Sequence, residues 1–347
     1  MLGNLQRISV FSIDWKSIVP MLRYVIGSCM ILAVTSLLNY DLAYLTSVLS
    51  LSLMAPGTKP LTLKQSIGAV LILAVITGFA VLFTELFMEY SLVFMPLLLL
   101  SMLWLYYTDK LPMIVKVFAL VSLTIIPFVS IDASIIGSYV AVHLVYNAFM
   151  AILLTQIVFV IFPLCEADIP FEKKKKQADK QSESQRFRYA VSIILILTPV
   201  LILFYMFKLS SSILVITFIA ILSVSPALAN PKFGLVMITA NVIGGLFGIL
   251  AYQLLVIVPN FVFMILLTFG IGIFFGSRLF SDSKYAPIFG SGFSTFLLIL
   301  GSVTSSDAEA GAKVWSRVIQ ISVAVSYIVF AFAVMQQVFP IKKNDKV

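Results

Sequence analysis

Residues 42–60, LAYLTSVLSLSLMAPGTKP, form a short apolar run that stops in a proline-rich turn. Residues 212–232, SILVITFIAILSVSPALANPK, repeat this arrangement in the second half of the chain. Each half also begins with an Arg-Tyr pair and ends with a Phe-Pro pair: Arg23-Tyr24 to Phe162-Pro163, and Arg188-Tyr189 to Phe339-Pro340. Matching landmarks in matching order predict one membrane unit that occurs twice.

The composition places this unit in a lipid bilayer. Of the 347 residues, 61% are hydrophobic and 11% are charged, so the chain has too little polar surface for a soluble protein. We interpret six apolar runs in each half as spans, which begin near Pro20, Leu42, Ser66, Ser91, Pro112 and Ser138, then near Phe187, Ser211, Gly234, Asn260, Tyr285 and Val314. We therefore expect an all-α membrane protein with about twelve transmembrane helices as two parallel six-helix repeats.

The charges agree with this count of spans. The termini, the central linker and alternate loops fall on one side, which holds all of the 23 lysines and arginines except Lys208, Lys313 and Arg317. Cytoplasmic loops carry the excess of basic residues, so this side and both termini are predicted to be cytoplasmic. The net charge of +8 then reflects membrane topology, and a nucleic acid is not an expected partner.

The same landmarks divide the chain into five segments. They are an N-terminal interfacial segment at 1–20, a first transmembrane repeat at 21–163, a cytoplasmic linker at 164–186, a second repeat at 187–340 and a C-terminal tail at 341–347. Lys173 to Lys176 in the linker form a basic run suited to anionic membrane lipids. We expect any transport path to follow the contact between the two repeats, and a homo-oligomer is compatible with this layout.

The shortened second span of each half is the best pointer to that path. Irregular backbone within a membrane is tolerated only where protein or a water-filled cavity satisfies its hydrogen bonds. Pro56 and Pro226 end these two spans and are candidate substrate-binding or gating residues. The alternative is that each helix simply stops at a proline at the cytoplasmic surface.

Polar residues inside the predicted spans supply the other candidates. Arg317, about one turn into the last span and near Asp307, is a candidate for contact with an anionic substrate or for gating; alternatively, its side chain extends to the outer interface. His143 and Asp307 are candidates for proton coupling, although a hydrogen-bonded structural role for His143 is the alternative. Asn147, four residues after His143 on the same helical face, and Asn241 either contact substrate or join helices.

Two glycine pairs predict close helix contacts. Gly244 and Gly248, and also Gly272 and Gly276, have the small-residue spacing that lets the backbones of two helices approach. We expect these pairs to serve packing and not to bind substrate.

The sequence also narrows the class of protein. It has no phosphate-binding loop of the Gly-x-x-x-x-Gly-Lys-Ser type, no Cys and His cluster with metal-ligand spacing, and no nucleophile beside a base. No Asp or Glu falls in the middle of a predicted span, which argues against a carboxylate relay at mid-membrane. We therefore expect no enzyme activity, no cofactor and no metal, and transport driven by a gradient or by partners.

Several short motifs resemble a known family. They are the Arg-Tyr openings, Pro56-Gly-Thr-Lys59, Asn230-Pro-Lys232, Lys64-Gln-Ser-Ile-Gly68 and Trp315-Ser-Arg317. Over roughly residues 22–340 the chain resembles the fusaric acid resistance and aromatic acid exporter family, in particular its short bacterial members that consist of the membrane domain alone. The resemblance implies an inner-membrane efflux protein that exports small, often aromatic, carboxylates and works with a periplasmic adaptor of the membrane-fusion type. Larger relatives have a cytoplasmic domain where this chain has only its short linker.

Residues and resemblance together predict a proton-coupled exporter of small organic acids in the bacterial cytoplasmic membrane. Two alternatives stay open. One is a passive organic-anion channel, in which the basic residues only set ion preference. The other is an assembly subunit that recruits partners through the basic linker, although such an anchor has no need of twelve spans.

Overall fold

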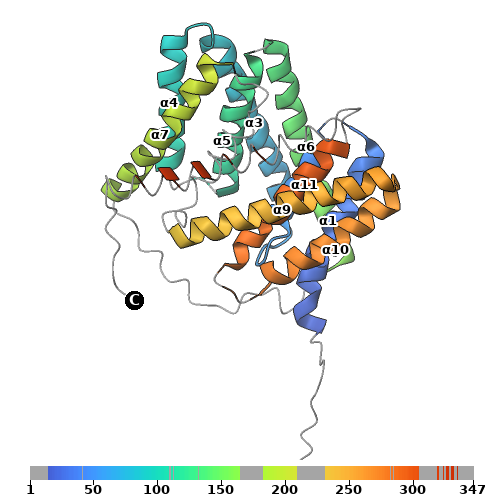
Figure 1. The fold of residues 1–347 in the computed structure, drawn as a ribbon. Helices are drawn as coiled ribbons and strands as arrows, with labels where there is room; N and C mark the ends of the chain where they lie inside the picture. Colours follow the sequence, from blue (N-terminus) through green and yellow to red (C-terminus); the bar gives the residue numbers. More distant parts are fainter. Residues whose placement is uncertain are drawn as a thin grey trace, which may run out of the picture.

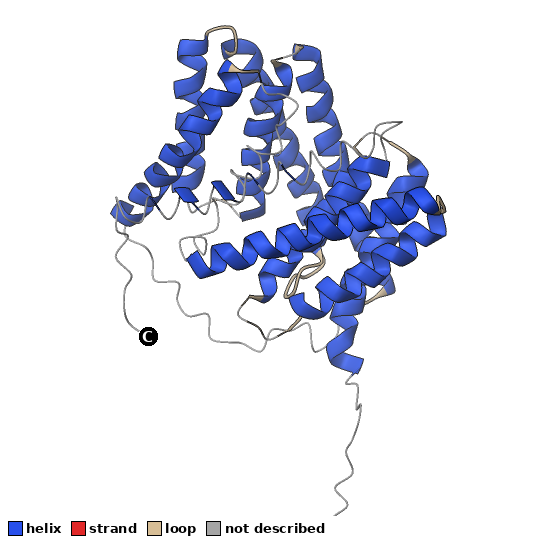
Figure 2. Cartoon of the chain, viewed as in Figure 1, coloured by secondary structure: helices blue, strands red, loops and turns tan. Residues whose placement is uncertain are grey.

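The structure is a computed structural model that describes residues 15–40, 42–108, 111, 113–131, 133–164, 183–208, 231–281, 283 and 285–304, together with 319, 323, 326, 327, 330, 331 and 334. All secondary structure in this described part is α-helical (Figure 2), which confirms the predicted all-α class. The helices are α1 (Trp15–Leu38), α2 (Tyr44–Leu53), α3 (Leu63–Phe87), α4 (Ser91–Tyr107), α5 (Met113–Ser130), α6 (Ser134–Ile161), α7 (Glu183–Met206), α9 (Pro231–Ile257), α10 (Phe261–Leu279) and α11 (Ala286–Thr304).

Helix length decides which of these elements can cross a bilayer alone. A crossing needs about 20 apolar residues, and α1, α3, α6, α7, α9 and α10 contain apolar stretches of 19 to 28 residues. The described parts of α2, α4, α5 and α11 are apolar but shorter. The chain is therefore a helical membrane protein, and six of the twelve predicted spans coincide with a described helix of full length. Residues 209–230 and most of the predicted last span lie outside the described residues.

Local sequence signals fix where two of the helices begin. At α3, the Thr62 hydroxyl accepts from the backbone of Gln65, and the Gln65 side chain accepts from the backbone of Thr62, at 3.3 and 2.9 Å. This reciprocal pair satisfies two amides that a helix start otherwise leaves without partners. At α10, the Asn260 side chain accepts from the amides of Val262 and Phe263. These helices therefore start close to the predicted positions.

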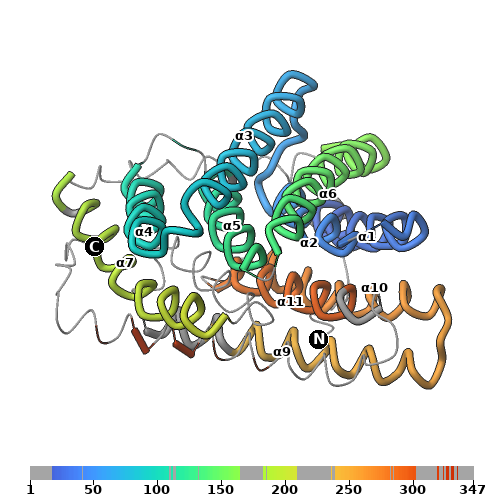
Figure 3. Tube along the Cα trace, turned by 90° about the horizontal axis from the view of Figure 1, so that it is seen from above, coloured from blue at the N-terminus to red at the C-terminus, as the bar shows by residue number. Residues whose placement is uncertain are grey.

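The two halves of the chain interlock. Helix α1 packs against α10, and α7 packs against α4, so each half places its first helix on the other half (Figures 1 and 3). One hydrophobic cluster is built mainly from α3, α4, α5 and α7, and a second mainly from α1, α2, α6, α10 and α11. Neither cluster is formed by one half alone, so the core binds the halves into a single unit.

The helices do not all run in one direction. In Figure 1, α9 runs across the view while α4 lies closer to its vertical, and in Figure 3, seen from above, α4 appears nearly end-on and α9 from the side. Transmembrane helices tilt by about 20° on average and up to about 40° from the bilayer normal. Helices inclined so steeply to each other can share one bilayer only if both are tilted.

The predicted glycine contacts are confirmed. A Cβ on Gly292 of α11 would lie 2.7 Å from the carbonyl oxygen of Ala240 in α9, so the two backbones touch where no side chain fits. Gly244 of α9 meets the backbone of Gly292 in the same contact. Gly272 and Gly276 of α10 both lie against Val25 of α1, at 2.8 Å from the place of an added Cβ. Small residues thus allow close contacts of α9 with α11 and of α10 with α1.

Candidate functional site

The short helix α2 lies where the two halves meet. It has 10 residues, about 15 Å of helix, which is half of what the hydrocarbon of a bilayer requires. It contacts α1 and α6 of the first half and α11 of the second. The approach to α11 is close because a Cβ on Gly301 would overlap the side chain of Tyr44, the first residue of α2. The predicted shortening of the second span is confirmed for the first half.

One face of α2 carries hydroxyl groups into the interior of the protein. Thr46, Ser47 and Ser50 have no exposed surface. Ser50 donates a hydrogen bond of 2.7 Å to the carbonyl of Ser47, and the Ser47 hydroxyl lies 3.4 Å from that of Thr35 in α1. Because a buried hydroxyl costs free energy unless it is bonded, these contacts stabilise a polar row on the side of α2 that meets α1.

A directed chain of hydrogen bonds joins α2 to α6 and to the connection between α1 and α2. The Asn147 amide nitrogen donates to the carbonyl of His143 at 2.7 Å, which leaves the amide oxygen facing Thr46 at 2.8 Å. That oxygen can only accept, so Thr46 donates to it, and the Tyr40 hydroxyl, 2.6 Å away, donates in turn to Thr46. Burial raises the pKa of Tyr40, so its hydroxyl keeps the proton that this chain requires.

A cavity of about 210 Å³ lies beside this chain of hydrogen bonds. The end of α1, the connection to α2, the start of α10 and the end of α11 form its walls, so both halves line it. Thr35, Asn39 and Tyr40 contribute polar atoms, whereas Phe261 and Met264 contribute apolar surface. The cavity therefore offers hydrogen bonds on one side and apolar contact on the other.

The first turn of α2 also borders this cavity, through Ala43 and Tyr44. A helix N-terminus carries partial positive charge and favours a negatively charged group near it. Ala43 provides no side-chain cap, while the amides of Leu45 and Thr46 bond to carbonyls three residues back along the chain. Because these amides are already bonded, the turn offers an anion the partial charge of the helix end, and the polar and apolar walls of the cavity supply the remaining contacts.

The connection before α2 holds two residues in the left-handed backbone region, Asn39 at φ 43° and Leu42 at φ 57°. Asparagine adopts this conformation readily, whereas for leucine it costs about 1–2 kcal/mol. Local strain of this kind collects at functional sites because the surrounding structure must hold it in place. The strained connection lies at the cavity and is consistent with a functional role there.

Of the two predicted asparagines, Asn241 lies apart from the junction. It is buried in α9, where its nitrogen lies 3.2 Å from the Ser291 hydroxyl and its oxygen accepts from Thr295 at 2.6 Å. Both partners belong to α11, so Asn241 joins two helices of the second half. The structure does not bring it together with Asn147, which belongs to the network around α2.

His143 contributes its backbone rather than its ring to that network. The ring stacks on Tyr139 with 4.1 Å between centroids, and its Nδ1 lies 3.0 Å from the Tyr139 carbonyl. Tyr139 is 47% exposed, so the stacked pair lies towards the outside of the helix bundle. The predicted placement of His143 and Asn147 on one helical face therefore brings the Asn147 amide to the His143 carbonyl, not to the imidazole.

Pro56 lies in an exposed turn beyond the end of α2. The amide of Thr58 donates to the carbonyl of Ala55 at 3.1 Å, and Gly57 between them has φ 80°. Proline followed by a glycine with positive φ is the pattern of a type II turn. Pro56 is therefore part of the turn that reverses the chain between α2 and α3. Pro226, Arg317 and Asp307 lie outside the described residues.

Arg23, which the sequence marked only as a landmark of the repeat, has a buried charge. Its side chain is 2% exposed, its guanidinium lies 4.7 Å from the centroid of the Phe159 ring, and Nη1 lies 3.5 Å from the carbonyl of Pro163. The opening Arg-Tyr pair of the first half therefore contacts its closing Phe-Pro pair. The sequence did contain a signal for this buried charge, because an arginine inside an apolar run is rare within a membrane unless it has partners.

The described residues contain no group of three or more His, Cys, Asp or Glu side chains that could hold a metal ion. No protein-family model, curated protein or solved structure matches the chain.

Proposed function

We propose that this chain transports small organic acids across the bacterial cytoplasmic membrane, through twelve spans in two like halves. This follows its resemblance to the fusaric acid resistance and aromatic acid exporter family. In this proposal the termini are cytoplasmic and the acid enters from the cytoplasmic side between the halves. A proton gradient drives export, and a periplasmic adaptor of the membrane-fusion type receives the acid.

The packing of the helices supports two like halves. If α1 corresponds to α7 and α4 to α10, the contact of α1 with α10 has its counterpart in that of α7 with α4. Likewise α3–α5 matches α9–α11, α4–α5 matches α10–α11, and α3–α4 matches α9–α10, and all of these contacts are present. Two copies of one helical unit around a shared two-fold axis produce such pairs.

Aromatic contacts occur at corresponding places in this arrangement. Tyr24, in the N-terminal half of α1, meets Phe280 directly after the end of α10, with ring centroids 5.7 Å apart. Phe187 near the start of α7 meets Tyr107 at the end of α4, at 6.2 Å. The same end of each first helix therefore docks on the same end of the fourth helix of the other half, which also supports the repeat.

The observation that carries the proposed function is the hydroxyl-bearing half-length helix at the junction. Short helices of membrane transporters leave their ends inside the protein, where amides and hydroxyls can replace the water around a substrate. Here α2, which contacts helices of both halves, buries Thr46, Ser47 and Ser50 and presents its first turn to the 210 Å³ cavity. A carboxylate with a small aromatic ring matches this combination of polar and apolar surface.

The proton-coupled form of the proposal assigns specific roles. Arg317 contacts the anion near the periplasmic mouth, and His143 and Asp307 couple a proton. The His143 ring stacks on the outer side of α6, so the coupling role proposed for it does not depend on a contact with α2. Arg317→Ala is expected to abolish export while the protein still inserts.

A passive anion channel is the second candidate, and one observation favours it. In the described helices the carboxylates stand near helix ends, Glu85 in the last turn of α3 and Glu183 at the start of α7. The polar groups around α2 are hydroxyls and amides, which bind an anion without exchanging a proton. A path of this kind conducts without a proton relay.

Purified protein in vesicles loaded with benzoate separates these functions. An exporter coupled to protons acidifies the vesicle interior as benzoate leaves and needs a pH gradient for net accumulation. A channel carries benzoate current without that gradient. Absence of benzoate flux above that of protein-free vesicles, tested also with a larger aromatic acid, would reject transport of organic acids.

A further inference from the structure

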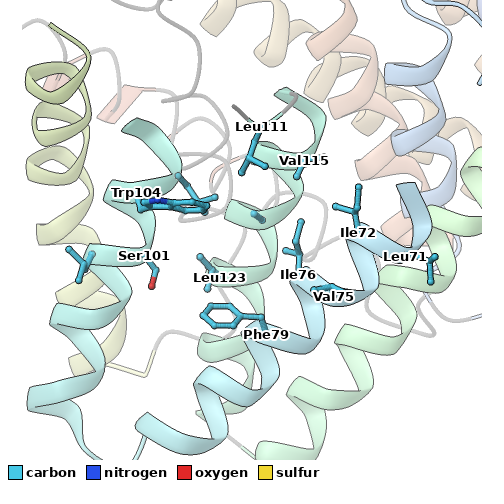
Figure 4. A pocket seen from close by; sticks show the side chains of 13 residues that line it. Leu71, Ile72, Val75, Ile76, Phe79, Ser101, Trp104, Leu111, Val115 and Leu123 are labelled. Carbon is cyan, nitrogen blue, oxygen red and sulfur yellow. The ribbon is translucent and has the colours of Figure 1, made fainter. Parts of the chain in front are cut away.

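A second, larger cavity lies on the outer side of the first half. It has a volume of about 900 Å³ and is formed between α3, α4 and α5 (Figure 4). Helices α3 and α4 diverge from the short turn that joins them (Figure 1), and residues of α5 line the space between them. The volume falls within the range of about 300–1,000 Å³ that is usual for small-molecule sites.

The lining of this cavity is apolar. Val75 of α3 and Leu100 and Trp104 of α4 are 71%, 58% and 58% exposed, and Ala119 of α5 is buried at the back. Ser101 supplies the one hydroxyl, which already donates to the carbonyl of Leu97 in its own helix at 2.8 Å. A polar ligand or ordered water would gain no hydrogen-bond network here, and apolar cavities of this kind do not hold water.

The surroundings of the cavity identify what can fill it. Only 28% of the apolar window of α3 is buried inside the protein, against 56% for α1, so α3 presents most of its surface to the bilayer. The exposed residues Ile67 and Leu86 of α3 continue the apolar surface beyond the cavity in both directions along the helix. Empty space would forfeit dispersion contacts with every lining side chain. Acyl chains are the flexible apolar groups that surround this face.

One end of the cavity has the chemistry of a membrane interface. Trp104 lies at the same end as Leu111 and Val115 (Figure 4), and Lys116, which is partly exposed, follows Val115 in α5. Tryptophan concentrates where hydrocarbon meets the headgroups. A lysine at that level attracts an anionic headgroup.

We propose that this cavity binds one acyl chain of an anionic phospholipid, with the headgroup beside Trp104 and Lys116. The tail is already in hydrocarbon, so its burial provides no hydrophobic gain and it is held by packing alone. Selectivity then comes from the headgroup: one lysine near it corresponds to a preference of about fivefold over a zwitterionic lipid. The site requires a membrane-embedded chain and is independent of what the protein transports.

Trp104 can report occupancy directly. The chain has 3 tryptophans, and replacing Trp15 and Trp315 by phenylalanine leaves Trp104 as the single tryptophan, whose fluorescence is excited selectively over that of the tyrosines. In phosphatidylcholine vesicles that contain increasing mole fractions of brominated phosphatidylglycerol, we expect quenching of Trp104 to reach half its maximum at a mole fraction about fivefold lower than with brominated phosphatidylcholine. Equal curves for the two lipids would contradict a headgroup-selective site.

Two matched pairs of variants locate the site. Ser101→Phe fills the cavity from α4 and should lower the quenching, whereas Leu86→Phe, on an exposed part of α3 outside the cavity, should not. Val75→Phe is the second filling variant if Ser101→Phe does not fold, since Val75 is 71% exposed. Lys116→Gln should remove the preference for phosphatidylglycerol. Lys208→Gln should keep it, because Lys208 is exposed just after the end of α7 that packs on the start of α4, where Tyr205 stacks on Phe94.

Other occupants give different results. If a second copy of the chain covers the cavity, Trp104 is shielded from brominated lipid at every mole fraction and the protein elutes as a dimer in detergent. If the lipid contacts are only those of an ordinary membrane surface, brominated lipid quenches Trp104 equally in the filling variants and in Leu86→Phe. Either outcome overturns the proposal.

Discussion

Replacing Asn147 by leucine tests whether the junction around α2 is a transport path, and the structure sets the expected cost. The variant loses the bond of 2.8 Å from Thr46 and the bond of 2.7 Å to the His143 carbonyl. The Thr46 hydroxyl keeps a second acceptor, the Asn147 backbone oxygen at 3.3 Å. We therefore expect the free energy of unfolding to fall by only about 1 kcal/mol, within the about 0.6–1.7 kcal/mol found for hydrogen bonds between membrane helices.

A double-mutant cycle isolates the bond itself. Thr46→Val and Asn147→Leu, alone and combined, should give a coupling energy of about 0.6–1.7 kcal/mol in unfolding by denaturant. Coupling near zero would mean that the Thr46 and Asn147 side chains contribute separately. The directed chain of hydrogen bonds from Tyr40 would then be wrong.

The functional readout is benzoate flux per folded molecule in vesicles. If the network forms part of the path, Asn147→Leu removes the acceptor that orders Thr46 and Tyr40, and a substrate that loses one hydrogen bond of about 1.4 kcal/mol binds about tenfold more weakly. Unchanged flux per folded molecule would refute the reading of α2 as the transport site and leave it a structural joint.

Asn241→Leu is the matched control for this experiment. It removes an equally buried asparagine that joins α9 to α11, so its stability loss should be similar. Flux should be retained if only the α2 junction carries substrate. An equal fall in both variants would show that any loosening of the helices slows transport, or that Asn241 also lies on the path.

Three further predictions concern stability, each measured as the shift of the unfolding midpoint in detergent. Gly292→Ala should cost about 1–3 kcal/mol, because its Cβ would lie 2.7 Å from a backbone oxygen that cannot swing away; Gly270→Ala, with nothing within 4 Å of its Cβ, should be neutral or stabilising by up to about 1 kcal/mol. Gly57→Ala should cost about 1–2 kcal/mol because Gly57 has φ 80°, and a neutral result would mean that the turn rearranges. Arg23→Lys should cost about 1 kcal/mol, since an ammonium reproduces the flat contact with Phe159 poorly; a lysine variant of full stability would show that this contact contributes nothing.

The positions of the helices were predictable because they depend on local properties of the chain. An apolar run cannot leave its amides without partners in lipid, so each run becomes a helix. The polar caps Thr62 and Asn260 mark where α3 and α10 begin. The early end of α2 was also readable, because Pro56-Gly57 provides a turn in which a helix cannot continue.

The candidate site was predictable only in part. Asn147 stood out as a polar residue inside an apolar span, and the structure shows it at the junction. Thr46, Ser47 and Ser50 were missed because hydroxyls are common in membrane helices, where each can bond to its own backbone. Their spacing places them on one helical face, which was the available signal. The spacing of these residues could not show which helices this face of α2 contacts.

By itself, the sequence determined that this protein is helical, that it belongs in a membrane and where its second helix stops, since hydrophobicity, capping and proline geometry act within a few residues. Only the tertiary structure decided that α1 docks on α10 and α7 on α4, and that α2 lies between the halves. In lipid every apolar helix face is equally well solvated, so the choice of partner depends on surface shape and on a few buried polar groups. Contacts such as Gly292 with Ala240 or Thr46 with Asn147 join residues far apart in the chain, and they exist only once the helices have packed.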